Sequence, residues 1–139
     1  MILAAVKSDS GSAGVVERGL DLARAYGDDL EVLNVMPQEE FERQWRERDD
    51  YYADTAAEEA AGRAREIVED AVSDDEGITV KGRVGEPVTE ILDEADQIDA
   101  TYIVISGRKR SPTGKALFGS TTQSLLLSSD RPIVTVMHD

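Results

Sequence analysis

Residues 106–120 read SGRKRSPTGKALFGS, a basic stretch that contains three glycines. The apolar run of residues 101–105 before it predicts a buried strand, and residues 121–127 after it predict a helix. Backbone N–H groups at the start of a helix have no partner within that helix and carry the positive end of its dipole. A glycine-bearing, basic loop between a strand and a helix therefore predicts an anion-binding site.

The charge of this stretch contrasts with that of the rest of the chain. The sequence has 29 acidic and 15 basic residues and a formal net charge of −14, and the stretch holds Arg108, Lys109, Arg110 and Lys115. An acidic surface repels nucleic acid and anionic membranes, which argues against both as partners. The acidic, lysine-poor composition is similar to that of proteins from salt-loving cells, and an ordinary acidic mesophilic protein is the alternative.

Length and composition predict one cytoplasmic domain. The chain has 139 residues, 40% of them hydrophobic, which suits a single domain over residues 1–139 with its own core. No apolar run approaches the roughly 20 residues that a membrane span needs. The apolar residues 1–6 are too few for a signal peptide. Cysteine is absent from the sequence, which excludes disulfides and thiolate chemistry.

The hydrophobic pattern on either side of the basic stretch predicts strands separated by helices. Strands are expected at residues 2–6, 30–36, 78–84, 101–106 and 133–137. Helices are expected at residues 12–26, from 52 to 72 or 73, after Gly85-Glu86-Pro87, and from 119 to 128. Residues 38–52 are crowded with charge and predict a mobile or variable insertion with helical tendency, on which Trp45 is expected to pack.

This alternation predicts an α/β fold. Near-continuous apolar strands joined by helices form a parallel sheet that is covered on both faces. Right-handed crossovers make this a doubly wound, three-layer sandwich, and Lys81 and Arg83 predict that the third strand lies at an edge. Ligands of such folds bind at the carboxyl ends of strands where the winding reverses, so the loops after the first and fourth strands are the candidate binding loops.

Several common catalytic motifs are missing from the sequence. Thr113-Gly114-Lys115-Ala116 lacks the upstream glycine and the following Ser or Thr of a phosphate loop. The only histidine, His138, is expected to be a tail residue, so no Ser-His-Asp set is available. No cluster of metal-ligand residues and no general base is evident. We therefore expect no metal site of the protein's own and, at most, slow turnover of a bound nucleotide.

A set of short motifs together resembles the universal stress protein family. The motifs are Gly107 with the later Gly119-Ser120 before a helix, the strand of residues 131–136, the turn Gly85-Glu86-Pro87, and the apolar first strand. The resemblance covers the whole chain. It implies the adenine nucleotide alpha hydrolase-like fold with strand order 3-2-1-4-5, and a homodimer paired through the fifth strand, residues Ile133, Val134, Thr135, Val136 and Met137.

The resemblance also implies a site for ATP or another adenine nucleotide, with or without Mg²⁺. In family members that bind ATP, loop glycines and a following Ser or Thr hold the phosphates and ribose. An Asp after the first strand and a Val after the second contact the base. Transferred to this sequence, the site residues are Val6, Lys7, Asp9, Val35, Ser106, Gly107, Arg110, Gly114, Lys115, Gly119, Ser120 and Thr121.

Two departures from the family pattern keep alternatives open. Arg110 stands where the second loop glycine is expected, in a loop one residue shorter, and it either blocks the phosphates or binds them through its guanidinium. Lys7 stands in place of the Asp, and an ammonium group cannot accept a hydrogen bond. A dimeric interaction protein that binds no nucleotide is therefore the alternative, and a phosphate-transfer enzyme is a third. Gly119, Ser120 and Asp9 also have a plain interpretation as helix starts and caps, and the basic cluster as a solvated loop.

Overall fold

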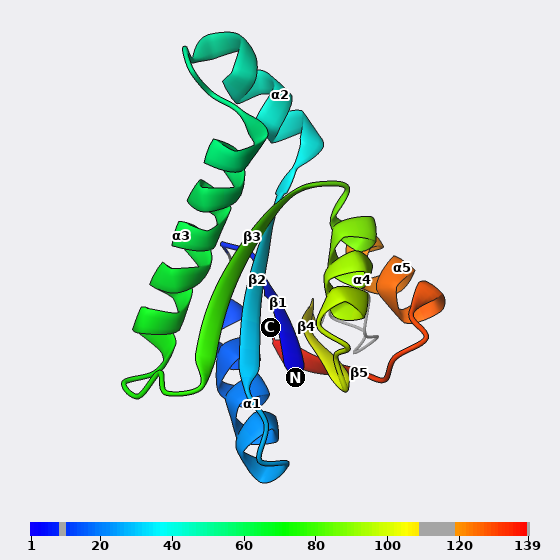
Figure 1. The fold of residues 1–139 in the computed structure, drawn as a ribbon. Coiled ribbons are helices and arrows are strands. Elements are labelled where there is room, and N and C mark those ends of the chain that lie inside the picture. The colour runs from blue at the N-terminus through cyan, green and yellow to red at the C-terminus, as the bar shows by residue number, and fades with distance from the viewer. Residues whose placement is uncertain (9–10, 109–118, 139) are drawn as a thin grey trace.

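The computed structural model describes residues 1–8, 11–108 and 119–138. Its strands form one five-stranded parallel sheet in the order β3-β2-β1-β4-β5, which confirms the predicted fold and strand order (Figure 1). The strands are β1 (Ile2–Val6), β2 (Leu30–Pro37), β3 (Ile78–Gly85), β4 (Tyr102–Arg108) and β5 (Ile133–His138). As predicted, β3 lies at an edge of the sheet.

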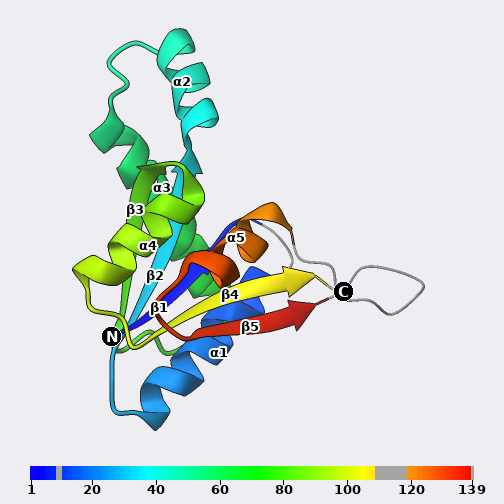
Figure 2. The same cartoon turned by 90° about the vertical axis from the view of Figure 1, so that its right-hand side faces the viewer.

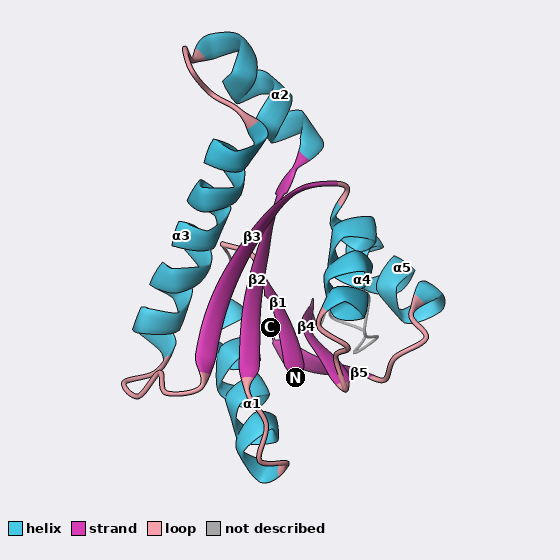
Figure 3. Ribbon diagram, viewed as in Figure 1, coloured by secondary structure: helices cyan, strands magenta, loops and turns pink. Residues whose placement is uncertain are grey.

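Helices cover both faces of this sheet (Figures 1 and 2). In the described residues they are α1 (Ser12–Ala25), α2 (Gln38–Glu47), α3 (Ala53–Ala71), α4 (Pro87–Gln97) and α5 (Ser120–Ser128). On one face lie α1 and α3, and on the other lie α4 and α5. The result is the predicted three-layer sandwich, in which short loops join the layers (Figure 3).

Alternate residues of the central strands fill two separate cores. Ile2 and Ala4 are fully buried in the core beneath α1 and α3, whereas Leu3 is fully buried in the core beneath α4 and α5. Because both faces of β1 are covered, its sequence is a continuous apolar run rather than an alternating one. Each fully buried Leu or Ile contributes roughly 1.5–3 kcal/mol, so the central strands hold the layers together.

A close approach between α3 and β3 depends on Gly82. A Cβ atom added at Gly82 would lie 1.9 Å from the carbonyl oxygen of Ala57 and 2.5 Å from the backbone nitrogen of Ala61. The side chains that α3 turns to the sheet are small as well: Ala60 and Ala64 are both fully buried there. The alanine periodicity of α3 is thus a packing requirement, not only a helix preference.

The charged insertion folds into α2 and a turn, which confirms its helical tendency and places it at the top of Figure 1. Tyr51, 2% exposed, anchors the segment: its ring lies 5.7 Å from that of Phe41, and the Arg48 guanidinium stacks over it at 4.3 Å. The prediction that Trp45 packs down was wrong, because its side chain is 59% exposed.

The strands β4 and β5 extend further than predicted. Gly107 pairs with Met137 and Arg108 pairs with His138, so residues assigned to the loop belong to the strand. His138 is likewise a strand residue and not a tail. Its imidazole lies so close to Gly11 that a Cβ there would be 2.5 Å from ring atoms. Polar residues can continue the strands because this end of the sheet reaches the surface and the ladder hydrogen bonds are independent of side-chain type.

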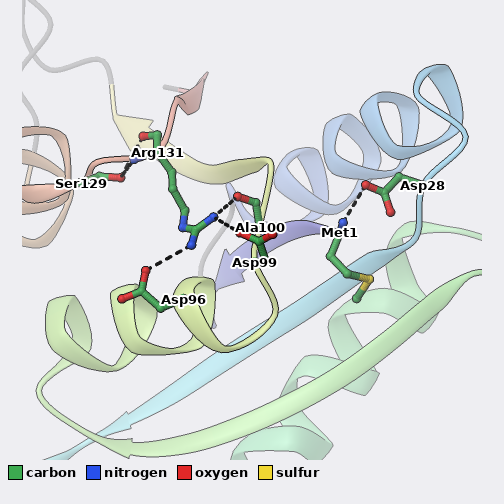
Figure 4. A network of polar contacts seen from close by, with 7 residues as sticks. All are labelled: Met1, Asp28, Asp96, Asp99, Ala100, Ser129 and Arg131. Carbon is green, nitrogen blue, oxygen red and sulfur yellow. Dashed lines mark hydrogen bonds and ion pairs between the residues drawn. The ribbon is translucent and has the colours of Figure 1, made fainter.

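A polar network joins the loops at the opposite, amino-terminal ends of β4 and β5 (Figure 4). The Arg131 guanidinium donates to the Ala100 carbonyl at 2.5 Å, to Asp99 at 3.2 Å and to Asp96 at 3.3 Å. The Ser129 hydroxyl accepts from the Arg131 N–H at 3.0 Å and donates to its carbonyl at 2.8 Å. This network fixes the entry into β5, so Arg131 at the start of the 131–136 motif has a structural role at the amino-terminal end of the strand.

Candidate functional site

A cleft opens at the carboxyl ends of β1, β2 and β4. Its volume is about 380 Å³, and residues of α2, α3, α4 and α5 complete its walls. The strand order reverses between β1 and β4, so the cleft lies at the switch point where doubly wound folds bind ligands. The loops after β1 and β4, predicted from the sequence as candidate binding loops, begin at this end of the sheet.

The structure brings several predicted site residues together in this cleft. Its lining includes Val6 and Lys7 at the end of β1, Val35 in β2, Ser106 in β4 and Thr121 in the first turn of α5. These residues come from distant parts of the sequence and meet because parallel strands all end at the same edge of the sheet.

Other predicted site residues lie outside this lining or outside the described residues. Gly107 is a buried residue of β4 and faces the other side of the sheet from its neighbour Ser106, which lines the cleft. Gly119 and Ser120 are exposed at the start of α5. No atom of the described residues comes within 4 Å of a Cβ added at Gly119, so packing among them does not require glycine there. The remaining predicted residues, Asp9, Arg110, Gly114 and Lys115, lie outside the described residues.

The first turn of α5 borders the cleft next to β4. The N-cap residue of α5 is Gly119, which has no side chain and so cannot accept a hydrogen bond from the first N–H groups of the helix. The Thr122 hydroxyl donates to the Ser106 carbonyl at 3.1 Å, which holds this turn against β4. The positive end of the α5 dipole is thus fixed at one side of the cleft.

The end of β1 is held by Ser12, the first residue of α1. Its hydroxyl accepts a hydrogen bond from the Lys7 N–H at 3.1 Å and donates one to the Lys7 carbonyl. Ser12 is 3% exposed, and the N-cap residue of α1 is Gly11, without a side-chain cap bond. The serine therefore fixes the backbone of Lys7 at the cleft instead of capping α1.

The start of α4 supplies the opposite wall through Pro87 and Ile91. The Glu86 carboxylate caps the helix by accepting from the N–H groups of Val88 at 3.2 Å and Thr89 at 2.8 Å, which confirms the predicted helix start. The hydrogen bond from Thr89 lowers the pKa of Glu86 below its ordinary value. Gly85 has φ +147°, a conformation that L side chains rarely adopt, so glycine is needed there.

Sequence reasoning missed Asn34, a polar residue inside the apolar strand β2. Its side chain lines the cleft, is 4% exposed, and donates from Nδ2 to the Val6 carbonyl at 2.9 Å. Its Oδ1 is buried and has no hydrogen-bond partner in the described residues. A polar residue in the middle of the apolar run of residues 32–36 is the signal that could have marked Asn34.

Sequence reasoning also missed a charged pair on the β2 side of the cleft. Glu40 comes from the first turn of α2 and Arg63 from α3, and Arg63 Nη2 lies 2.6 Å from Glu40 Oε1. The side chains are 23% exposed for Glu40 and 37% exposed for Arg63. The hydrogen bond to Glu40 raises the pKa of Arg63 above its already high ordinary value. The pair lies within charged segments that resemble solvated helix faces, so nothing local in the sequence singles it out.

The described residues contain neither a metal-binding cluster nor a membrane-spanning helix. No group of three or more His, Cys, Asp or Glu side chains there could hold a metal ion. No helix in the same part of the chain is both long enough and apolar enough to span a bilayer.

Comparisons with known proteins agree with this architecture. The sequence profile of the Universal stress protein family matches residues 1–137. A universal stress protein of Mycolicibacterium smegmatis is 31% identical over 139 residues, covering 98% of this chain and 96% of the relative. A solved universal stress protein from Archaeoglobus fulgidus is 30% identical with a TM-score of 0.65, covering 96% of both chains. Another structure from that organism, in complex with dAMP, is 24% identical with a TM-score of 0.60 and covers 96% of this chain and 94% of its own.

Proposed function

Since this chain belongs to the universal stress protein family, we propose that it is a stress-response module that binds an adenine nucleotide, foremost ATP, in the cleft between β1 and β4. The observation that carries the proposal is the cleft itself. It lies at the switch point, has a volume of about 380 Å³, and gathers Val6, Lys7, Val35, Ser106 and Thr121 from separate elements. A protein of the same fold has been solved with dAMP, an adenine nucleotide, which supports this choice of ligand class.

The cleft has a helix start on one side and apolar side chains on another, which suit the phosphates and the base of a nucleotide respectively. Phosphates would bind at the start of α5, where the N–H groups of Ser120 and Thr121 and the helix dipole favour an anion. Arg110 and Lys115 are proposed to add charge-assisted hydrogen bonds there. The base would lie against the apolar surfaces of Val35 and Ile91. The protein would act in the cytoplasm, where ATP is available.

Calorimetric titration with ATP at high salt tests this function. We expect saturable heat in the millimolar range or below, and a raised melting temperature. Thr121→Asp should abolish binding, because a carboxylate at the first turn of α5 repels phosphate while leaving the helix dipole satisfied. The matched control is Ser124→Asp, an exposed position of the same helix outside the cleft, which should bind ATP like the wild type. The absence of both heat and stabilisation at millimolar ATP would refute the proposal.

A second candidate function is a dimeric interaction protein, and the fifth strand favours it. β5 ends the sheet order, and its residues Ile133–His138 are all only partly buried, including four apolar ones. An apolar edge strand of this length is a template for pairing with a second copy. We propose a homodimer paired through β5. Light scattering should give twice the chain mass, and Thr135→Pro should give a monomer. A monomeric wild type would refute the dimer.

Substituting Arg110 by Gly separates nucleotide binding from the alternative of an interaction protein that binds no nucleotide. If Arg110 binds phosphate, Arg110→Gly weakens ATP binding. If it obstructs the phosphates, the same substitution creates or strengthens binding.

A further inference from the structure

The charged groups at the two sides of the cleft differ. At the β4 side, Thr121 belongs to the first turn of α5, where the helix dipole is positive. At the β2 side, Glu40 and Arg63 come from α2 and α3, on the far side of β1 in the sheet order. Glu40 and Arg63 together carry no net charge, whereas the start of α5 favours an anion, so a nucleotide would lie with its phosphates at α5 and its base near Glu40. This orientation rests on the proposed nucleotide function.

Glu40 offers an oxygen to a ligand in this position. Arg63 holds Oε1 at 2.6 Å, and no hydrogen bond to Oε2 is made in the described part of the chain. An ionised carboxylate only accepts hydrogen bonds, and it has about four acceptor sites. The Arg63 contact therefore fixes the orientation of Glu40 without using up its acceptor capacity. With 23% of its side chain exposed, Glu40 is within reach of a molecule in the cleft.

The other side chains near the base end are poorer acceptors. Asn34 Oδ1 is completely buried, so a ligand could not reach it without displacing the β2 end. The Lys7 ammonium group only donates. Val35 and Pro37 are apolar. Among these residues Glu40 is the acceptor whose charge and exposure suit an exocyclic amine.

We propose that Glu40, oriented by Arg63, accepts a hydrogen bond from the 6-amino group of adenine and thereby selects adenine nucleotides. A hydrogen bond to a charged group is stronger than one between neutral groups, so loss of the amine should weaken binding by about tenfold or more. Glu40 is a specificity-determining residue in this account, and Arg63 is its positioning residue.

The test compares two ligands that differ only in the amine: ATP, and the ATP analogue whose purine lacks the 6-amino group. Both carry the same phosphates, so any general charge effect of a substitution cancels in the ratio of their dissociation constants. The wild type should prefer ATP by about tenfold, and Glu40→Ala should bind both ligands equally. Glu40→Gln, which retains a carbonyl acceptor and the side-chain shape, should show an intermediate ratio if Glu40→Ala fails to fold.

The matched control is Glu59→Ala. Glu59 is also an acid of the α2–α3 region paired with an arginine, Arg48 at 2.8 Å, but it does not line the cleft. Its variant should keep the wild-type ratio. A wild type that binds both ligands equally, or a Glu40→Ala variant that keeps the preference, overturns the inference and leaves the proposed function standing. A wild type that binds neither ligand overturns both.

Discussion

Replacing Glu31 by Gln should make the stability of this protein less dependent on pH. Glu31 in β2 is 7% exposed and Glu94 in α4 is 2% exposed, and the two carboxyl groups face each other beneath α4. Glu31 Oε1 has no hydrogen-bond partner in the described residues. The Arg83 guanidinium holds Glu94 at 2.7 Å and Glu90 at 2.9 Å.

The pair retains one proton at neutral pH. Burial, helped by the hydrogen bond and negative charge of Glu94, raises the pKa of Glu31 from 4.5 to about 8, although Lys81 and Arg83 oppose the rise. Burial acts in the same direction on Glu94, but hydrogen bonds from Glu31 and Arg83 prevail and hold the pKa of Glu94 below its ordinary value. The raised pKa of Glu31 therefore governs the pH dependence above pH 4.5.

The sign of the effect follows from this raised pKa. Between about pH 4.5 and pH 8, Glu31 loses its proton in the unfolded chain and keeps it in the folded one, so the contribution of Glu31 to stability is complete below pH 4.5 and declines up to pH 8. At 1.36 kcal/mol per pKa unit, the shift sets a ceiling of about 5 kcal/mol. Relaxation of the buried site and entry of water lower this ceiling, so we expect about 1–3 kcal/mol.

Urea unfolding at about pH 5 and about pH 9 measures the effect. Gln has the shape of the protonated acid and cannot ionise, so the stability of Glu31→Gln relative to the wild type should rise by about 1–3 kcal/mol from the lower pH to the higher. Asp93→Asn removes a charge from the exposed side of α4 without touching the pair and serves as the control. A Glu31→Gln difference that is the same at both pH values, or that falls at high pH, would refute the reasoning.

Three further predictions concern stability. Gly82→Ala should lower the free energy of unfolding by about 3 kcal/mol or more, because its Cβ meets the backbone of α3; a loss below about 1 kcal/mol in urea unfolding would mean that α3 shifts easily. Glu86→Ala should cost about 1 kcal/mol through loss of the α4 cap; an unchanged urea midpoint would contradict that role. The net charge of −14 predicts a melting temperature that rises with KCl, because salt screens self-repulsion; a melting temperature that falls in scanning calorimetry would contradict it.

The fold could be predicted from the sequence because the features that specify its strands and helices each lie within a few neighbouring residues. The apolar runs of β1 and β2, the Gly85-Glu86-Pro87 helix start and the edge charges of β3 each act within a few residues. The ends of β4 and β5 were misjudged because pairing between Arg108 and His138 depends on a partner distant in sequence. Polar residues at a strand end give no sign of whether such a partner exists.

The candidate site was only partly predictable for the same reason. Val35, Ser106 and Thr121 follow strands or begin a helix, and topology alone brings them to one edge. Glu40 and Arg63, in contrast, lie 23 residues apart on two helices, and their pairing depends on how the chain returns from α2 into α3 (Figure 1). A charged residue in a charged segment is more often solvated than part of a cleft, so pattern reasoning passes over it.

The most direct test of the central claim is a map of backbone amide shifts by NMR during titration with ATP. If the cleft binds the nucleotide, the amides of Lys7, Val35, Ser106 and Thr121 should shift together and saturate at one dissociation constant. The amide of Val72, at the far end of α3, should stay in place. Shifts that are absent, or that gather away from the carboxyl ends of β1, β2 and β4, would contradict the account.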